Sequence, residues 1–118
     1  MSASWINAVD YATVRSVKGS GMLLIDVRAP AELNESGKLP ESINIPLDEL
    51  EAALNKMDNK DFCLNYGCEK PNFDVPLIFS CRSGNRSTHA ANIAVNLGYK
   101  NVHNYVGGWL DWQRQAEK

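Results

Sequence analysis

The sequence predicts an α/β domain with a mainly parallel sheet of about five strands and helices on both faces. Two unbroken apolar runs, Met22–Ile25 and Val75–Ser80, are typical of strands buried on both faces of a parallel sheet. Segments with apolar residues at helical spacing separate the runs, and such alternation indicates parallel strands joined by crossovers. A chain of 118 residues is long enough to bury one core and too short for two, so residues 1–118 are predicted to form a single domain.

The first half of the chain supplies alternating strand and helix signals that end at glycine or proline. In order, they are a brief segment at Trp5–Ile6, a helix with Val9, Ala12, Thr13 and Val17 on one face that stops at Gly19, the strand Met22–Ile25, a short helix at Ala29–Leu33 with Pro30 in its first turn, a short strand at Ser42–Asn44 before Pro46, and a helix with Leu47, Leu50, Ala53 and Leu54 on one face.

The second half begins with the least patterned stretch, about 55–75, which is interpreted as a variable insertion. The elements expected from there on are a helix over Asp58–Tyr66 stopped by Gly67, the strand Val75–Ser80, a buried helix through Leu97 capped by Gly98, a strand at Asn101–Tyr105, and a final helix at Trp109–Gln115.

The composition argues against several classes of function and location. Twelve basic against fourteen acidic residues give a net charge of −2, which argues against a nucleic-acid-binding surface. No apolar run approaches the roughly 20 residues that span a bilayer, and the first residues lack the basic and apolar regions of a signal peptide. Three cysteines, an odd number, favour a reducing compartment. The expectation is a cytoplasmic protein that binds neither membrane nor nucleic acid, with an organelle address and the oligomeric state left open.

The stretch Cys81–Thr88 carries the chemistry. Its cysteine closes a predicted strand, a helix opens behind it, and Gly84 lets the intervening backbone curl with its N–H groups pointing inward. A thiol at the focus of those donors, beside Arg82 and Arg86, should have its pKa lowered by the helix dipole and the guanidinium groups. These are the surroundings of a nucleophile.

A free cysteine is more often a small buried hydrophobic residue, and each of the three cysteines has this alternative. The polar and basic neighbours of Cys81 build no apolar pocket, which favours a reactive thiol there. Cys63 is expected to pack on its helix and Cys68 to be exposed, with a redox role for the two as the minor alternative. His89 and His103 have no partner at ligand spacing, so no metal site is predicted.

The loop pattern, a cysteine followed by four residues and an arginine, resembles the rhodanese family, and residues 81–86 would form its six-residue active-site loop. A related class of cysteine phosphatases carries one residue more in this loop, which argues against phosphatase activity. Three further segments match the family in order: Leu24–Arg28, Gly37–Pro46 and Gly107–Trp109. The resemblance spans most of the chain and implies a rhodanese-like single domain.

The resemblance also implies an activity: sulfane sulfur moves from thiosulfate or a persulfide donor to a thiol or cyanide acceptor, through a persulfide on Cys81 and without a cofactor. Catalysis would rest on Cys81. Substrate would be bound by Arg82, Ser83, Gly84, Asn85, Arg86 and Ser87, with Asp26, Arg28 and Trp109 in support. The partners would be a small anionic sulfur donor and a small thiol or thiol-protein acceptor. The alternative is a non-catalytic module on the same fold that binds a partner or carries a persulfide.

Several positions depart from the family pattern. Lys38 stands where the family commonly has histidine, and Glu41 and Ser42 replace Gly-Ala. Larger thiosulfate-using members are expected to carry basic residues where this chain has Ser83 and Glu32. The positive charge for a dianion would therefore come from Arg82 and Arg86 alone, which makes a persulfide a rival to thiosulfate.

Some residues near the loop have two open interpretations. Asp26 and Arg28 are expected to pair as a structural support rather than to act in the chemistry. Trp109 and Trp112 are expected to face the core, although a Gly-Gly-Trp turn beside the loop could also line the mouth of the site. Arg86 is as well placed to brace the loop as to touch substrate.

Overall fold

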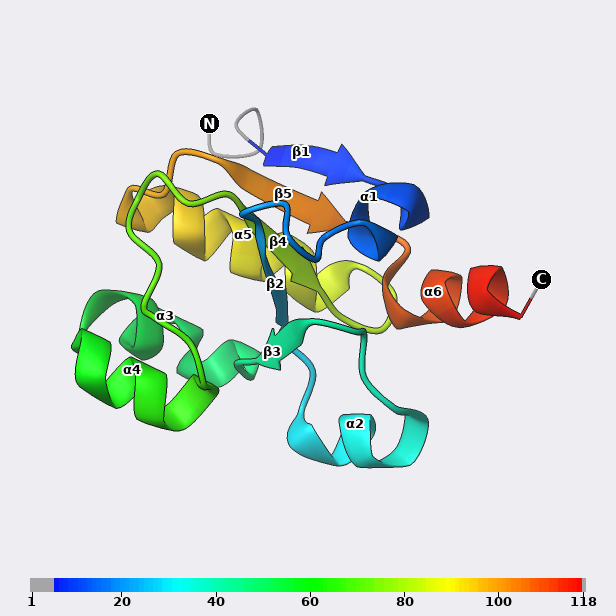
Figure 1. Ribbon diagram of the computed structural model, residues 1–118, viewed down its shortest axis with the longest axis horizontal. Coiled ribbons are helices and arrows are strands. Elements are labelled where there is room, and N and C mark those ends of the chain that lie inside the picture. Colours follow the sequence, from blue (N-terminus) through cyan, green and yellow to red (C-terminus); the bar gives the residue numbers. More distant parts are fainter. Residues whose placement is uncertain (1–5, 118) are drawn as a thin grey trace.

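The computed structural model describes residues 6–117, so the Trp5 half of the first expected segment lies outside the described residues. Strands and helices alternate along the chain (Figure 1). In order they are β1 (Ile6–Val9), α1 (Tyr11–Arg15), β2 (Leu23–Asp26), α2 (Pro30–Ser36), β3 (Ser42–Asn44), α3 (Leu47–Asn55), α4 (Asn59–Tyr66), β4 (Leu77–Ser80), α5 (Asn85–Leu97), β5 (Val102–Tyr105) and α6 (Gly108–Ala116).

The five described strands form one sheet in the order β1-β5-β4-β2-β3, and every pairing is parallel. This confirms the predicted fold class. The connection from β2 leads to β3 at one edge, whereas the connection from β4 leads to β5 on the other side. The carboxyl ends of β2 and β4 therefore border the crevice where open α/β sheets bind their ligands. Asp26 lies opposite Ser80 at this point.

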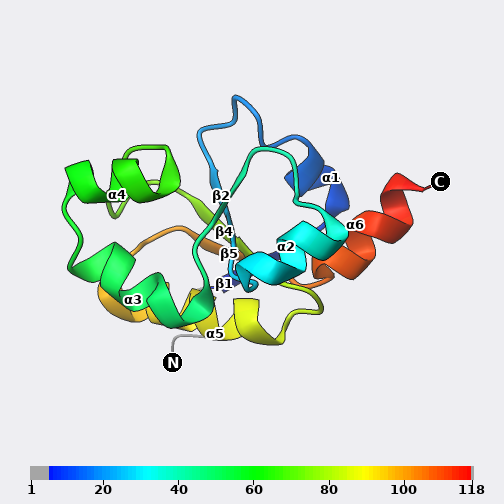
Figure 2. The same ribbon diagram turned by 90° about the horizontal axis from the view of Figure 1, so that it is seen from below.

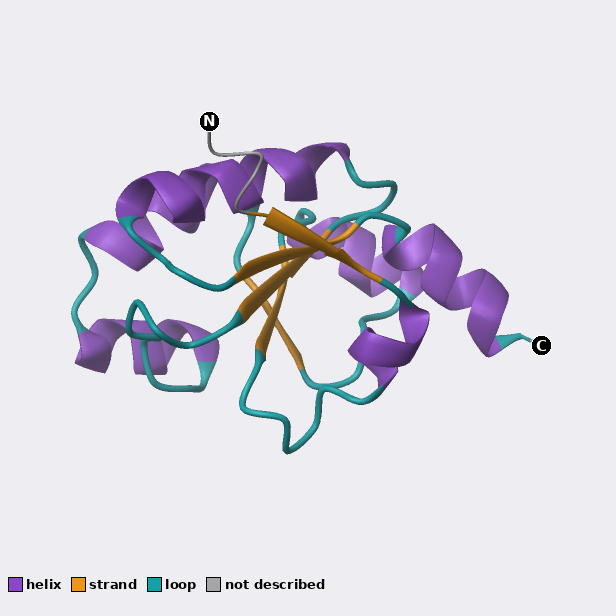
Figure 3. Ribbon diagram, turned by 90° about the horizontal axis from the view of Figure 1, so that it is seen from above, coloured by secondary structure: helices purple, strands orange, loops and turns teal. Residues whose placement is uncertain are grey.

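Helices cover both faces of the sheet (Figure 3). On one face α3, α4 and α5 pack around buried residues of the central strands, such as Ile25 and Phe79. Figure 2 shows α3 and α5 side by side on that face, in agreement with their contacts. On the other face α1 and α6 cover Leu24 and Ile78, together with Tyr105. The alternation of side chains along each short strand supplies both cores.

The first helix was placed too early. Val9 was expected on its apolar face, but Val9 ends β1, where it lies opposite Tyr105 of β5. Asp10 then caps α1 by accepting a hydrogen bond from the Thr13 N–H at 3.1 Å. Val9 is in a strand because it pairs with β5, which is distant in sequence, although the local spacing of apolar residues is that of a helix. The second helix also runs further than expected, because α2 continues past Leu33 to Ser36.

Other element ends agree with the predictions. Asp58 caps α4, and Gly67 and Gly98 end α4 and α5 in the left-handed conformation with φ of 80° and 111°. Within residues 6–117, the structure contains no helix with the length and apolar character needed to cross a membrane.

The expectation for the two cysteines of the α4 region was wrong. Cys63 is exposed, and Cys68 is the partly buried one, packed against the core. The reason is helical geometry: Phe62 is the residue of α4 that is buried, so the next side chain around the helix points away from the core. Burial raises the pKa of the Cys68 thiol.

Candidate active site

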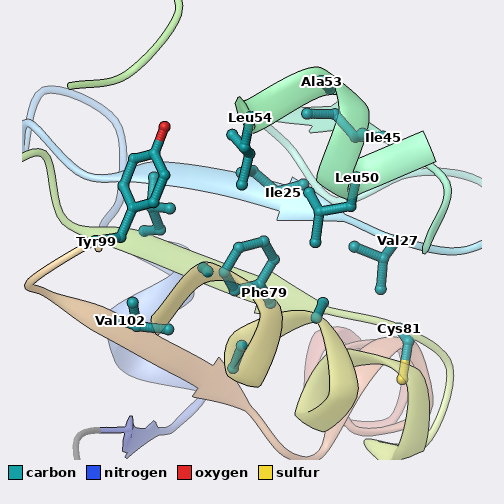
Figure 4. Close-up of a cluster of buried hydrophobic side chains, with 14 of the residues drawn as sticks. Ile25, Val27, Ile45, Leu50, Ala53, Leu54, Phe79, Cys81, Tyr99 and Val102 are labelled. Carbon is teal, nitrogen blue, oxygen red and sulfur yellow. The ribbon is translucent and has the colours of Figure 1, made fainter. Parts of the chain in front are cut away.

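Cys81 lies directly after β4, at the carboxyl edge of the sheet, and α5 begins at Asn85. Figure 4 shows the residue at one end of the core cluster, near Val27. Its side chain is buried, with 1% of the residue exposed. The predicted order of strand, cysteine, loop and helix is confirmed.

Two neighbouring groups contact the Cys81 sulfur. The Gly84 N–H donates to Sγ at 3.0 Å, and the Ser87 Oγ lies 3.4 Å away, accepting from the thiol or donating to the thiolate. Burial acts to raise the pKa of Cys81, but the Ser87 hydroxyl and the amides of Ser87, Gly84 and Ser83 together lower it below its ordinary value of 9.0.

The direction of this pKa shift agrees with the sequence-based expectation, but its main causes differ. The arginines were expected to stabilise the thiolate, whereas the largest favourable contributions come from the hydroxyl and amides of the loop itself. Arg82 is exposed, and Arg86 is engaged elsewhere. The loop therefore works as a ring of hydrogen-bond donors around a buried sulfur.

The start of α6 holds the back of the loop. The Trp109 N–H donates to the Cys81 carbonyl oxygen at 2.8 Å, and the Leu110 N–H donates to that of Arg82 at 3.2 Å. Gly108 has a φ of 60°, and a Cβ there would lie 2.4 Å from the Cys81 carbonyl oxygen. The Gly107–Trp109 motif thus has a direct physical role, because only glycine lets the two backbones approach so closely.

Gly84 meets a similar constraint, against the residue just before this motif. Its φ is 103°, and a Cβ there would lie 2.7 Å from the carbonyl oxygen of Val106. The glycine that turns its N–H toward the sulfur is therefore also the residue that lets the loop pack on the segment after β5. A side chain at this position would displace the donor from Sγ.

Asp26 and Arg28 form the buried pair that was expected. The Arg28 Nη2 donates to Asp26 Oδ2 at 2.8 Å, and both side chains are 1% exposed. The guanidinium also donates to Ser36 Oγ and to the Gly37 carbonyl oxygen, and it lies 5.0 Å from the Trp109 ring centroid. The pair thereby ties the end of β2 to α2 and α6.

Asn44 is a supporting residue that the sequence analysis missed. Its Nδ2 donates to the carbonyl oxygens of Asp26 and Arg28, both at 2.9 Å. Asn44 lies inside the segment Gly37–Pro46 that matches the family, and this position was the one sequence feature that could have identified it as a supporting residue. It fixes the turn that carries Arg28 away from the end of β2.

Arg86 pairs with Glu32 of α2. Its Nη1 and Nη2 donate to Oε2 and Oε1 at 2.6 and 2.9 Å, respectively. The hydrogen bonds from Arg86 are the largest cause that lowers the pKa of Glu32 to about 2. This pair links the start of α5 to α2, as the bracing role of Arg86 requires, and contact of Arg86 with substrate stays a prediction. Nothing in the sequence marked this pair, since 54 positions separate the two residues.

Two hollows flank this ion pair. A cleft of about 380 Å³ is lined by Arg28, Glu32, Glu35, Ser36, Arg82, Trp109, Leu110 and Gln113. A more apolar hollow of about 460 Å³ is lined by Val27, Ala29, Pro46, Leu47, Asp48, Arg86, His89 and Ile93. Glu32 borders the first and Arg86 the second, so the ion pair reaches from one to the other.

The remaining predicted site residues divide by exposure. Ser83 and Asn85 are exposed on the loop, whereas Gly84 and Ser87 are buried beneath it. Trp109 and Trp112 are partly buried against the α1 side of the sheet, and Trp109 also lines the first cleft, so it combines both expected positions. Among residues 6–117 no group of three or more potential ligand side chains could hold a metal ion.

The fold and the loop define a class of protein: α/β domains that carry a cysteine between a central strand of a parallel sheet and a buried helix. A family model described as the Rhodanese-like domain matches residues 11–115. The chain belongs to this family, as the loop motif indicated.

Two relatives and one solved structure are similar over most of their length. Rhodanese domain-containing protein CG4456 of Drosophila melanogaster is 51% identical over 106 residues, 89% of this chain and 95% of that protein. Thiosulfate:glutathione sulfurtransferase of Homo sapiens is 39% identical over 106 residues, 88% of this chain and 90% of that protein. The structure of the human single-domain sulfurtransferase TSTD1 is 35% identical with a TM-score of 0.82, covering 92% of this chain and 96% of that one. The chain is a rhodanese-type sulfurtransferase.

Proposed function

We propose that the chain moves sulfane sulfur from thiosulfate or a persulfide donor to a thiol or cyanide acceptor, through a persulfide on Cys81. The observation that carries this proposal is the contact of Sγ with the Gly84 N–H at 3.0 Å, beside the Ser87 hydroxyl at 3.4 Å. Both groups stabilise a thiolate, and the pKa of Cys81 is lowered accordingly. The name of the human relative, a thiosulfate:glutathione sulfurtransferase, supports both substrate classes.

In the first step the Cys81 thiolate attacks the outer sulfur of thiosulfate. The sulfur–sulfur bond of the donor breaks, its electron pair leaves with sulfite, and a persulfide remains on Cys81. In the second step an acceptor thiolate, or cyanide, attacks the outer sulfur of that persulfide, and the Cys81 thiolate leaves. Neither step requires a metal or an organic cofactor.

The loop residues have distinct proposed roles in these steps. The Gly84 amide and the Ser87 hydroxyl stabilise the negative charge of Cys81 before attack and after release. Arg82, exposed on the rim of the cleft, binds the anionic donor, and Ser83 and Asn85 complete the rim. Arg86 acts indirectly, through Glu32. Asp26, Arg28 and Trp109 hold the loop in position.

The test is an incubation with thiosulfate and cyanide, with thiocyanate as the product measured. Mass spectrometry of the protein after thiosulfate alone should show a gain of one sulfur atom, and Cys81→Ser should show none. A parallel incubation with p-nitrophenyl phosphate should release no phosphate. A wild-type protein that forms neither thiocyanate nor a persulfide would contradict the proposal and favour a module that only binds a partner.

A further inference from the structure

Three arginines line the two hollows beside the loop, and two of them are paired with carboxylates. Arg28 is paired with Asp26, and Arg86 is paired with Glu32. The side chain of Arg82 makes no hydrogen bond or ion pair with any other residue in 6–117, and it borders the cleft between α2 and α6. A donor entering there meets one unpaired cation.

The same cleft also carries an acidic group. Glu35 also lines it and is exposed. The charged residues that line this cleft are Arg28 and Arg82 against Glu32 and Glu35, so their formal charges sum to zero. A dianion therefore finds no excess of positive charge to offset its desolvation.

Glu32 is held where it is by three hydrogen bonds. Its two oxygens accept the bidentate bonds from Arg86, and Oε2 also accepts the Ala29 N–H at 2.9 Å. The two side chains are 36% and 30% exposed for Arg86 and Glu32, so the pair is at the surface of the site rather than in the core. Arg86 cannot turn to a substrate without breaking both of its bonds to this anchored carboxylate.

We propose that Glu32 determines the charge of the sulfur donor. By neutralising Arg86 it makes the site favour a donor with one negative charge, of which a thiol persulfide is the natural class, over dianionic thiosulfate. This inference rests on the proposed function and assigns the specificity of that reaction to a residue outside the loop. Glu32 is a positioning and specificity residue, and it does not touch the reacting sulfur atoms.

A matched pair of donors isolates the charge. Thiosulfate carries two negative charges, and methanethiosulfonate carries one, with a methyl group in place of one oxygen. Both present a terminal sulfur to the Cys81 thiolate. Attack breaks the sulfur–sulfur bond in each, leaving the same persulfide on Cys81, with sulfite released from the first and methanesulfinate from the second. Cyanide then takes the sulfur as thiocyanate in both assays.

The variant is Glu32→Gln, which keeps an oxygen for the Ala29 N–H and for one bond from Arg86 while removing the charge. Removing one unit charge close to a monoanionic donor in a hydrated site should change kcat/KM by about fivefold. A dianionic donor has twice the charge, so the change in its interaction free energy is twice as large. We therefore expect the ratio of kcat/KM for thiosulfate to that for methanethiosulfonate to rise about fivefold, mainly through KM. The control Glu51→Gln removes an exposed carboxylate of α3 and should leave the ratio unchanged.

A purely structural role for Glu32 predicts something different. The variant would then lose kcat equally with both donors and melt earlier, with an unchanged ratio, and that result would overturn the inference. The proposed function would survive it, since thiocyanate would still form. Absence of product with either donor in the wild-type protein would instead overturn the proposed function itself.

The wild-type protein supplies a second measurement that does not depend on the variant folding. With a neutral entrance, kcat/KM for thiosulfate should change less than about twofold between low and physiological salt. A steep fall of kcat/KM with increasing salt would show that the dianion meets a positively charged entrance, and it would contradict the inference. In folded Glu32→Gln the salt dependence should appear.

Discussion

Ser87 is the side chain whose removal should change the Cys81 sulfur most directly. Its hydroxyl lies 3.4 Å from Sγ and 3.1 Å from the Gly84 carbonyl oxygen, so its single proton is donated to the carbonyl oxygen beside a thiol and to the sulfur beside a thiolate. The same hydroxyl is the largest cause that lowers the pKa of Cys81. The nucleophile is therefore tuned by a residue on the first turn of α5, six positions after it, which lies beyond the loop itself.

Ser87→Ala should raise the pKa of Cys81, because the thiolate loses a donor while the amide of Gly84 remains. The rate of alkylation by iodoacetamide, followed against pH, should have a midpoint below 9.0 in the wild type and a higher one in the variant. At neutral pH the variant should alkylate several-fold more slowly. Ser83→Ala, whose side chain is exposed, serves as the control. Identical profiles for the wild type and Ser87→Ala would show that the hydroxyl does not act on the sulfur.

Cys81→Ser should form no thiocyanate above the uncatalysed rate while it keeps the fold, since a hydroxyl is not ionised at neutral pH. Cys63→Ser and Cys68→Ser should retain wild-type activity. Circular dichroism and melting curves establish that each variant is folded. An inactive but folded Cys63 or Cys68 variant would mean that sulfur passes between cysteines.

For single residues, the sequence predicted which side chain is the nucleophile but not all of the residues around it. The loop motif identified Cys81 because the residues of this motif are consecutive in the sequence. The Glu32–Arg86 pair was invisible because it joins residues of α2 and α5 that are 54 positions apart in the sequence. The burial of Cys63 and Cys68 was misjudged because an irregular stretch carries no clear period from which to assign a helix face.

Among the elements, α6 has the closest relation to the loop. Its first amides donate to the carbonyl oxygens of Cys81 and Arg82, and its tryptophans pack on the α1 side of the sheet. A helix predicted only as the final element thus forms part of the active-site wall. Its boundaries were predictable from the glycine pair, but its contact with a loop more than twenty residues earlier was not.

Gly108→Ala should distort the loop, because its Cβ would lie 2.4 Å from the backbone oxygen of Cys81. We expect a loss of about 3 kcal/mol in the free energy of unfolding and at least a tenfold loss of kcat. Gly67→Ala is the matched control: its φ is also positive, at 80°, but nothing lies within 4 Å of the new Cβ. That variant should lose about 1 kcal/mol and keep its activity. Equal effects of the two substitutions would contradict a specific role for close packing at Gly108.

The buried pair at the end of β2 permits a stability test. Arg28→Met should lower the free energy of unfolding by about 3–5 kcal/mol, because the carboxylate of Asp26 is left buried without its partner. Lys18→Met removes an equal charge from an exposed pair, in which Lys18 Nζ lies 4.0 Å from Glu41 Oε1. This substitution should change the free energy of unfolding by less than about 0.5 kcal/mol. Urea titrations of both variants measure the difference. A small loss at Arg28 would mean that the pair contributes little.

For the whole molecule, the parallel sheet with helices on both faces was the most predictable feature and the first strand the least. Continuous apolar runs revealed β2 and β4, which lie in the middle of the sheet. β1 is an edge strand of four residues with two exposed side chains, so its apolar signal is weak. Its existence depends on pairing with β5, a partner almost a hundred residues away in sequence.

Stability should also depend on pH through the lowered carboxyl pKa values. The pKa of Glu32 falls from 4.5 to about 2 on folding, and Arg86 is the main cause. A lowered pKa contributes stability that is fully present above the unfolded value and is lost as pH falls through the folded one. The urea midpoint of the wild type should therefore decline between about pH 5 and pH 2, and Glu32→Gln should flatten part of that decline. An unchanged slope in the variant would show that the ion pair does not contribute.

The position of β1 beside β5, with α6 closing the loop from behind, also constrains how the protein is made. On the ribosome, the edge strand at Ile6–Val9 must wait for Val102–Tyr105, and the Cys81 carbonyl oxygen must wait for the amide of Trp109. Chains grow at about 5–20 residues per second, so for several seconds the nascent chain holds an exposed sheet edge and an unsupported thiol. The reactive cysteine is completed last, when the final helix is in place.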